Sequence, residues 1–340
     1  MNPDQKRILA LDGGGLMGLI SLGILAEVEA QLCATSGGHD SFRLRDYFDY
    51  IGGTSTGGII AAGLMMGRSV AEMRDFYINN GAAMFAKANC FRRVISGFSH
   101  QYDPRNLKEM LQKEFSEKTI LELQNEGVLP ADKHLLMVMR NHSTDSCWPV
   151  STNPAAMYNH ADRHNCNRKI PLWQFILAST AAPSYYPPEH VDFSDGSEQT
   201  FQDGGLTAHN NPALKMFQMA TAPQYKLGWE TGEEKLMILS IGTGLAYAPA
   251  QTKSIFGPWL GELAKRTPAD LVRNFNVEND LTCRVLGSCT YGPFLDREVG
   301  AMVEEQPIKT GTRLFTYIRY DADVSQAALK KLGCEPKLRY

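Results

Sequence analysis

The chain has 340 residues, of which 43% are hydrophobic and 21% are charged, and this composition excludes disorder, collagen and coiled coil as its main state. Lys and Arg number 34 against 37 Asp and Glu, so the formal net charge of -3 does not favour a nucleic acid polymer as partner. Seven cysteines without a CxxC pair predict neither a disulfide framework nor a zinc ribbon.

No signal peptide is predicted at the start of the chain. Residues 1–7 are polar, and the apolar residues that follow are interrupted at once by Asp12 and three glycines. The apolar run at 59–66 is too short to span a bilayer. We therefore expect a cytoplasmic protein.

Two strand–loop–helix units are predicted near the N-terminus. Residues 7–11 are apolar and end at a glycine loop, after which apolar residues recur at three- and four-residue spacing, as in a helix. Residues 47–52 predict a second strand, and a turn leads into a buried helix at 59–66. Two such units in succession favour an α/β fold with a mainly parallel sheet and helices on its faces.

Strand and helix patterns continue as far as Gly244. The predicted elements are strands at 134–139, 199–202 and 235–241, and helices at 172–178 and 212–219. Beyond Gly244 the sequence contains mixed helical stretches and one predicted strand at 312–320. We therefore predict a core of residues 1–245 and a C-terminal extension of residues 246–340 that packs on it.

Residues 53–57 have the sequence GTSTG, which fits the G-x-S-x-G pattern of a nucleophile elbow. The pattern follows a predicted strand and precedes a predicted helix, so a sharp turn would expose the hydroxyl of Ser55. The helix N-terminus favours negative charge on that oxygen. A glycine-rich turn with an N-cap serine is the simpler alternative, and we expect Ser55 to be a nucleophile.

A serine nucleophile needs a base, and two sets of partners fit the sequence. A triad would use Asp203 and His209, although an α/β-hydrolase carries its acid and its histidine on separate loops. A dyad would use Asp203 alone, which precedes two glycines at the end of a predicted strand and is ionised at neutral pH. An Asp-Gly pair by itself predicts only a hairpin turn.

The first glycine loop also allows two functions. Gly13, Gly15 and Gly18 fit the G-x-G-x-x-G pattern of a dinucleotide-binding loop, but Asp12 would place a like charge beside a pyrophosphate. In a hydrolase, the backbone N–H groups of Gly14 and Gly15 would instead form an oxyanion hole. A nucleotide-binding protein is therefore the alternative to an enzyme.

Together these segments resemble the patatin-like phospholipase family. Three blocks carry the resemblance in the family's order, with two further similar segments after Ser55, and the similarity extends over roughly residues 7–244. The three blocks lie at 12–18, 53–57 and 203–205, and the further segments at 178–188 and 210–212. The resemblance implies a three-layer α/β/α core with a mainly parallel sheet.

The resemblance also implies a role for each candidate residue. Ser55 is the nucleophile, Asp203 the base, and Gly13, Gly14 and Gly15 form the oxyanion loop. The implied activity is a phospholipase A reaction, in which fatty acyl esters of membrane phospholipids are hydrolysed without a metal or cofactor. The enzyme would act at the inner face of a membrane.

The sequence departs from the family at Met17, where the family usually has Arg. Loss of that cation is expected to weaken the ordering of the loop or its attraction for phosphate, which makes a sensor with a weakened active site a further alternative. A bacterial subgroup with this layout acts in antiphage defence and is switched on by cyclic dinucleotides. The resemblance therefore implies a cyclic dinucleotide activator. Because a lipase inside a cell needs control, a homo-oligomer is a further expectation, and residues 246–340 are where we first look for either surface.

Overall fold

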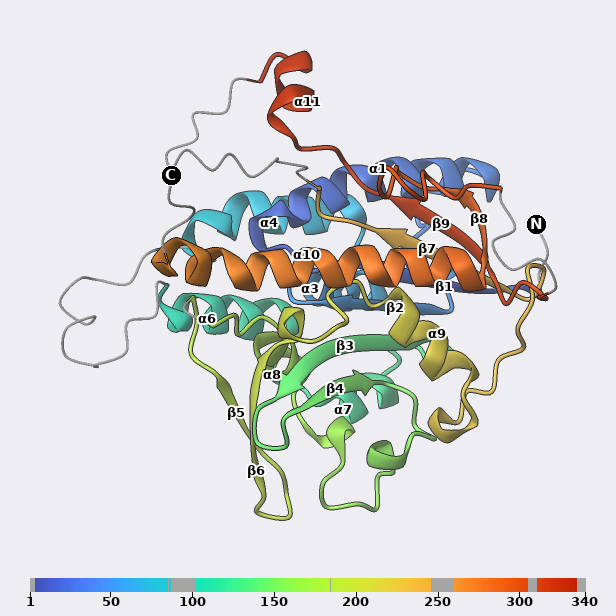
Figure 1. Cartoon of the computed structure of the whole chain (residues 1–340). Helices are drawn as coiled ribbons and strands as arrows, with labels where there is room; N and C mark the ends of the chain where they lie inside the picture. Colours follow the sequence, from blue (N-terminus) through green and yellow to red (C-terminus); the bar gives the residue numbers. More distant parts are fainter. Residues whose placement is uncertain are drawn as a thin grey trace.

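The computed structural model describes residues 4–84, 86, 102–183, 185–245, 260–304 and 311–334 (Figure 1). The strands are β1 (Lys6–Leu11), β2 (Tyr50–Thr54), β3 (His134–Asn141), β4 (Ser146–Ser151), β5 (Glu189–Asp192), β6 (Glu198–Asp203), β7 (Leu236–Ile241), β8 (Ser288–Tyr291) and β9 (Thr316–Tyr320). The helices are α1 (Gly18–Thr35), α2 (Leu44–Tyr47), α3 (Thr56–Met65), α4 (Val70–Met84), α6 (Pro104–Phe115), α7 (Ile120–Asn125), α8 (Leu172–Ser179), α9 (Ala213–Thr221), α10 (Leu260–Leu286) and α11 (Gln326–Lys331). Short 3-10 turns include η1 (Gly15–Met17) and η4 (Gly204–Leu206).

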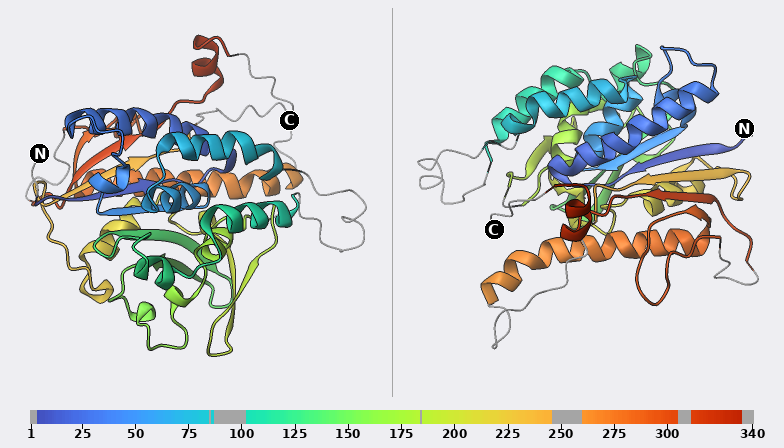
Figure 2. Two further views of the ribbon diagram at one scale, coloured as in Figure 1. Left: turned by 180° about the vertical axis from the view of Figure 1, so that it is seen from behind. Right: turned by 90° about the horizontal axis from the view of Figure 1, so that it is seen from above.

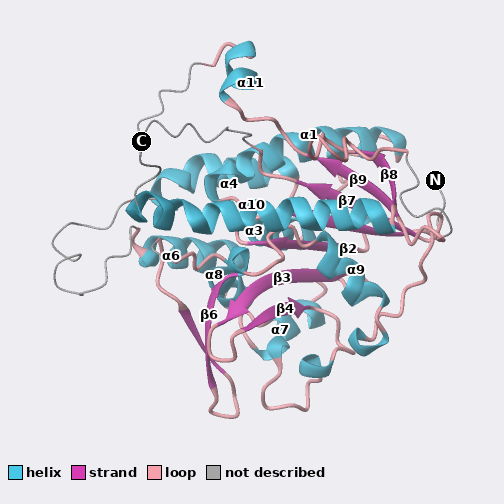
Figure 3. Cartoon of the chain, in the orientation of Figure 1, coloured by secondary structure: helices cyan, strands magenta, loops and turns pink. Residues whose placement is uncertain are grey.

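The described strands form one sheet, which Figure 3 shows in magenta between the helices. Its order is β5-β6-β3-β2-β1-β7-β9-β8, and β4 pairs with β3. The pairs from β3 through β2, β1, β7 and β9 to β8 are parallel, whereas β4, β5 and β6 join in antiparallel pairs. The predicted α/β class with a mainly parallel sheet is confirmed.

Helices cover both faces of this sheet. Successive residues of a strand point to opposite faces, and β1 follows this rule. Leu9 and Leu11 join an apolar cluster with α1, α3, α4, α6 and α8, whereas Ile8 and Ala10 join a second cluster with α9 and α10. The view from above in Figure 2 shows α10 on the opposite side of the sheet from α1 and α4. The predicted three-layer arrangement is therefore also confirmed.

Strands from beyond residue 245 belong to the same sheet. β9 pairs in parallel with β7, from Met237 opposite Thr316 to Ile241 opposite Tyr320, and β8 adds outside β9. The strand predicted at 312–320 is present in a shorter form, and β8 was not predicted. The division at residue 245 stays a prediction, and in the structure the sheet extends across it.

One described stretch, Gly15–Thr35, is long and apolar enough to cross a bilayer by length and composition, with a mean hydropathy of 1.6. In the fold this stretch is η1 followed by α1, and Leu22 and Leu25 of α1 pack into the core. Only 22% of its most apolar window is buried in the described structure, and one helix of this kind near the N-terminus is weak evidence for a membrane span.

Candidate active site

The sheet brings the two predicted reactive residues together through its pairing. β2 runs parallel to β3 and ends with Thr54 opposite Val138, whereas β6 runs antiparallel to β3 and ends with Asp203 opposite Met139. Because Val138 and Met139 are consecutive, the carboxyl ends of β2 and β6 meet head to head along β3. The residue after β2, Ser55, therefore lies beside Asp203.

The side chains of Ser55 and Asp203 are hydrogen-bonded. Ser55 Oγ donates to Asp203 Oδ2 at 2.7 Å, and the other carboxylate oxygen accepts the backbone N–H of Gly205 at 2.7 Å. Asp203 is 6% exposed, whereas Ser55 is only partly buried. The hydroxyl of Ser55 does not cap α3. Ser55 occupies the N-cap position of α3, but capping does not account for its hydroxyl, which is bonded to Asp203.

The backbone at Ser55 forms a sharp turn. Its φ of 55° and ψ of -122° are rarely adopted by a residue with a side chain and cost about 1–3 kcal/mol. The flanking glycines permit the turn, because a Cβ on Gly53 would lie 2.1 Å from the carbonyl carbon of Gly57. Ser179 Oγ accepts the N–H of Ser55 at 2.9 Å and donates to the carbonyl of Val138 at 2.6 Å. The surroundings thus fix Ser55 in the conformation expected of a nucleophile elbow.

Burial raises the pKa of Asp203 to about 6, although hydrogen bonds from Ser55 and Gly205 oppose the shift. A carboxyl with this pKa is mostly ionised at neutral pH and can accept a proton from Ser55. Its affinity for that proton is greater than that of an ordinary aspartate, which suits a general base that works near neutral pH.

His209 does not complete a triad. Its backbone carbonyl accepts a hydrogen bond from Thr54 Oγ1 at 2.7 Å, but within the described residues its ring is hydrogen-bonded to neither Ser55 nor Asp203. Its Nδ1 is buried and has no hydrogen-bond partner among the residues that the structure describes. Burial, reinforced by Lys215, lowers the pKa of His209 to about 4. The geometry therefore favours the dyad among the two arrangements that the sequence allowed.

The first glycine loop is anchored at Gly13. The N–H of Gly13 donates to the carbonyl of Asn210 at 3.1 Å, and its own carbonyl accepts from Asn210 Nδ2 at 3.2 Å and Thr243 Oγ1 at 3.0 Å. The N–H of Gly13 is therefore already hydrogen-bonded within the protein, whereas the role of Gly13, Gly14 and Gly15 as the oxyanion loop stays a prediction. In the described part of the chain the N–H groups of Gly14 and Gly15 donate to no other backbone or side-chain group. These two groups remain as candidate donors.

Two neighbours of the loop, Asp12 and Met17, also bear on the expectations from the sequence. Asp12 is 1% exposed and pairs with Arg319, which also pairs with Asp321, so the charge of Asp12 is buried and partly compensated. The argument from Asp12 against a pyrophosphate at this loop is therefore weaker than the sequence indicated. Met17 lies in η1 and is 40% exposed, so no cation of η1 faces the loop.

Functional candidates that sequence reasoning missed include Ser179, Asn210, Thr243 and Arg319. Asn210 and Ser179 lie inside segments that carried the family resemblance, and this was their only signal. Thr243 lies between two glycines after a predicted strand, which is compatible with an ordinary turn. Nothing in the sequence around Arg319 indicates a contact with the first glycine loop.

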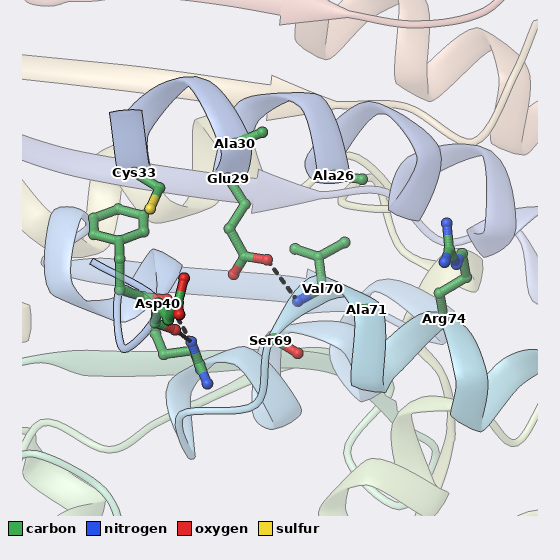
Figure 4. A pocket seen from close by; sticks show the side chains of 11 residues that line it. Ala26, Glu29, Ala30, Cys33, Asp40, Ser69, Val70, Ala71 and Arg74 are labelled. Carbon is green, nitrogen blue, oxygen red and sulfur yellow. Dashed lines mark hydrogen bonds between the residues drawn. The ribbon is translucent and has the colours of Figure 1, made fainter. Parts of the chain in front are cut away.

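A pocket of about 440 Å³ lies elsewhere, between α1 and α4 (Figure 4). Its lining includes Glu29 of α1, Arg43 before α2 and Val70 of α4, and none of the predicted site residues. Glu29 accepts the N–H of Val70 at 3.0 Å, a contact that joins the two helices. The pocket is therefore separate from the Ser55–Asp203 site.

Comparison with known proteins gives consistent matches. Residues 9–217 match the family model described as patatin-like phospholipase. The chain is 29% identical to Patatin-15 of Solanum tuberosum over 260 residues, and 27% identical to Patatin-17 of Solanum cardiophyllum over 258 residues. Each match covers 71% of this chain and 61% of the relative, so the chain spans about three fifths of the length of these relatives.

Among solved structures, the chain is similar to VipD from Legionella pneumophila, with a TM-score of 0.40 and 13% identity, over 94% of this chain and 62% of that one. It is also similar to ExoU from Pseudomonas aeruginosa, solved in complex with SpcU, with a TM-score of 0.35 and 14% identity, over 81% of this chain and 51% of the other.

Proposed function

The chain belongs to the patatin-like phospholipase family, whose model covers residues 9–217, and from this premise we propose that it is a lipid acyl hydrolase of phospholipase A type. Its substrates are the fatty acyl esters of membrane phospholipids. The observation that carries the proposal is the 2.7 Å hydrogen bond from Ser55 Oγ to Asp203 Oδ2 at a strand–turn–helix elbow.

In the proposed reaction, Ser55 Oγ attacks the ester carbonyl carbon while its proton passes to Asp203 Oδ2. The oxyanion that forms accepts hydrogen bonds from the N–H groups of Gly14 and Gly15, each worth about 10²–10³ in rate. The C–O bond to the glycerol then breaks, and the leaving alkoxide takes the proton from Asp203. Asp203 next deprotonates a water that attacks the acyl-serine, the bond to Ser55 Oγ breaks, and Asp203 returns the proton to Ser55 Oγ as the fatty acid is released.

Apolar side chains beside the site support a lipid substrate. Leu16 and Met17 follow the glycine loop directly and are 49% and 40% exposed. Leu206, three positions after Asp203, is 39% exposed. Exposure of apolar side chains of this size to water is unfavourable, and their burial against an acyl chain would stabilise the enzyme–lipid complex.

The hydrogen-bonded Ser55–Asp203 pair favours an active enzyme over a sensor with a weakened site. It also favours a hydrolase over a nucleotide-binding protein, because a nucleotide loop has no need of a strained serine paired with a buried carboxylate. We also propose that the protein is cytoplasmic, acts at the inner face of a membrane, serves in antiphage defence, is activated by a cyclic dinucleotide and forms a homo-oligomer. A lipase inside a cell needs such control, because constant activity would damage the cell's own membrane.

The test is release of free fatty acid from vesicles of mixed phospholipids, measured with and without a panel of cyclic dinucleotides. We expect release by the native protein, with low basal activity and a large increase on addition of the right nucleotide. Ser55→Ala removes one hydroxyl from the turn and should abolish release in a folded protein. Unchanged release by folded Ser55→Ala would contradict the assignment. High release that no nucleotide changes would contradict the activator alone.

A further inference from the structure

We propose that Arg319, on a C-terminal strand outside the family-matched segment, is a positioning residue that holds the candidate oxyanion loop through Asp12. This inference rests on the proposed function, because it assigns Arg319 to the same reaction. The pairing that carries it is bidentate: Arg319 Nη1 donates to Asp12 Oδ1 at 2.8 Å, and Nη2 donates to Asp12 Oδ2 at 2.7 Å. Asp12 is bonded covalently to Gly13, the first residue of the loop.

The strand register explains how these distant residues meet. Arg319 of β9 lies opposite Ser240 of β7, which in turn lies opposite Ala10 of β1. Asp12 follows Ala10 by two positions and continues on the same face of the sheet. The Arg319 side chain therefore reaches past β7 to the end of β1, and Ser240 Oγ accepts a hydrogen bond from Nη1 at 2.7 Å on the way.

Arg319 also supports the loop from a second side. Its Nη2 donates to Asp321 Oδ2 at 2.7 Å, and Asp321 Oδ1 accepts the N–H of Gly244 at 2.8 Å. The neighbour of Gly244 is Thr243, whose hydroxyl donates to the carbonyl of Gly13 at 3.0 Å. One guanidinium thus fixes both the residue before Gly13 and the segment that bonds to Gly13.

The chemistry of this cluster suits positioning. Arg319 and Asp12 are each 1% exposed, and apolar residues in place of a buried ion pair are often equally stable. A planar guanidinium, however, fixes a carboxylate in direction as well as in distance. Oxyanion donors must lie within a few tenths of an ångström of the position that the developing charge will occupy. Asp12 is a rigid anchor two residues before Gly14, the first candidate donor, and can provide this control.

The test compares conservative variants of two buried arginines. Arg319→Lys keeps the charge and loses the bidentate contact with Asp12. Arg284→Lys makes the same change at Arg284, which is 1% exposed and pairs in bidentate fashion with Asp280, without a hydrogen bond to the glycine loop. Both proteins are assayed with a water-soluble short-chain ester, and their thermal unfolding is recorded as a control for folding.

We expect Arg319→Lys to lower kcat by about tenfold or more with KM nearly unchanged, because oxyanion donors act on the transition state. Asp12→Asn should give the same pattern, and it replaces Arg319→Lys if that protein does not fold. Arg284→Lys should leave kcat of the folded protein nearly unchanged. Full kcat in the folded Arg319 and Asp12 variants, or an equal loss in Arg284→Lys, would overturn the proposal.

A second readout separates this proposal from the proposed function. Amide hydrogen exchange is followed at residues 12–18, where the N–H groups of Asp12 and Gly13 are hydrogen-bonded in the structure. We expect faster exchange there in Arg319→Lys than in Arg284→Lys, whatever the activity of the native protein. If the native protein lacks Ser55-dependent activity, the proposed function fails. If residues 12–18 exchange equally fast in the two variants, the positioning role of Arg319 fails, whatever the activity.

Discussion

At the scale of single residues, chemistry at Ser55 depends on the protonation state of Asp203. Its pKa is raised to about 6 by burial, so the carboxyl gains its proton at a higher pH than an ordinary aspartate. Only the ionised form accepts the serine proton, and kcat/KM should therefore fall about tenfold per pH unit below about 6 and be level above it. The measurement is a profile from about pH 4.5 to 8 with a soluble ester. A midpoint of the profile near pH 4 would contradict the assignment of Asp203 as the general base.

The second residue-scale prediction separates a dyad from a triad. Asp203→Asn keeps the shape of the side chain and removes proton acceptance, so kcat should drop by about 10²–10⁴. His209→Ala should lower kcat far less, because the ring is hydrogen-bonded to neither reactive residue in the described structure. Initial rates of the two variants distinguish a dyad from a triad, with circular dichroism as the folding control. Equal losses in two folded proteins would favour a triad.

At the scale of elements, the turn between β2 and α3 depends on close backbone contacts. A Cβ on Gly57 would lie 2.3 Å from the carbonyl oxygen of Leu11, whereas a Cβ on Gly58 would meet no atom closer than 3.5 Å. Gly57→Ala should therefore destabilise the protein by about 1–3 kcal/mol, because β1 and α3 would have to move apart. Gly58→Ala should be neutral or stabilising by up to about 1 kcal/mol through helix propensity. Urea unfolding measures both, and an unaltered midpoint for Gly57→Ala would be the contrary result.

The elements that the sequence predicted best are the buried central strands and the helices that follow them, since a continuous apolar run identifies both. The strand predicted at 47–52 begins instead at Tyr50, because residues 44–47 form α2, with Asp46 bonded to the N–H of Arg43. β4 contains Pro149, which reads as a break but is tolerated at an edge strand. Pro268 likewise predicts a break in a helix, but it lies inside α10, which is one continuous helix.

At the scale of the whole molecule, the candidate site combines residues that the sequence could identify with others that it could not. Ser55 and Asp203 belong to local patterns with a chemical meaning, and their contact follows from the pairing of β2 and β6 with β3. Arg319 and Asp12 are 307 positions apart, and the registers of β9 with β7 and of β7 with β1 bring them together. Contacts of this kind depend on the order of strands in the sheet, which the apolar pattern does not specify.

The shared sheet leads to a prediction about truncation. Residues 1–245 alone would lose β9, expose the edge of β7 and leave Asp12 without its guanidinium partner. Removal of one partner from a buried ion pair costs about 3–5 kcal/mol, apart from the apolar area lost with β8 and β9. We therefore expect the fragment to be insoluble or to unfold well below the full chain. A soluble fragment with the thermal midpoint of the full chain would contradict this.

The central claim is that Ser55 is an activated nucleophile paired with Asp203. Its most direct measurement is the mass of the intact protein after incubation with a fluorophosphonate that carries an alkyl chain, followed by peptide mapping. The native protein should gain one phosphonyl group on Ser55, folded Ser55→Ala should gain none, and Asp203→Asn should react far more slowly. No adduct on the native protein, or an adduct at a different residue that persists in Ser55→Ala, would contradict the claim.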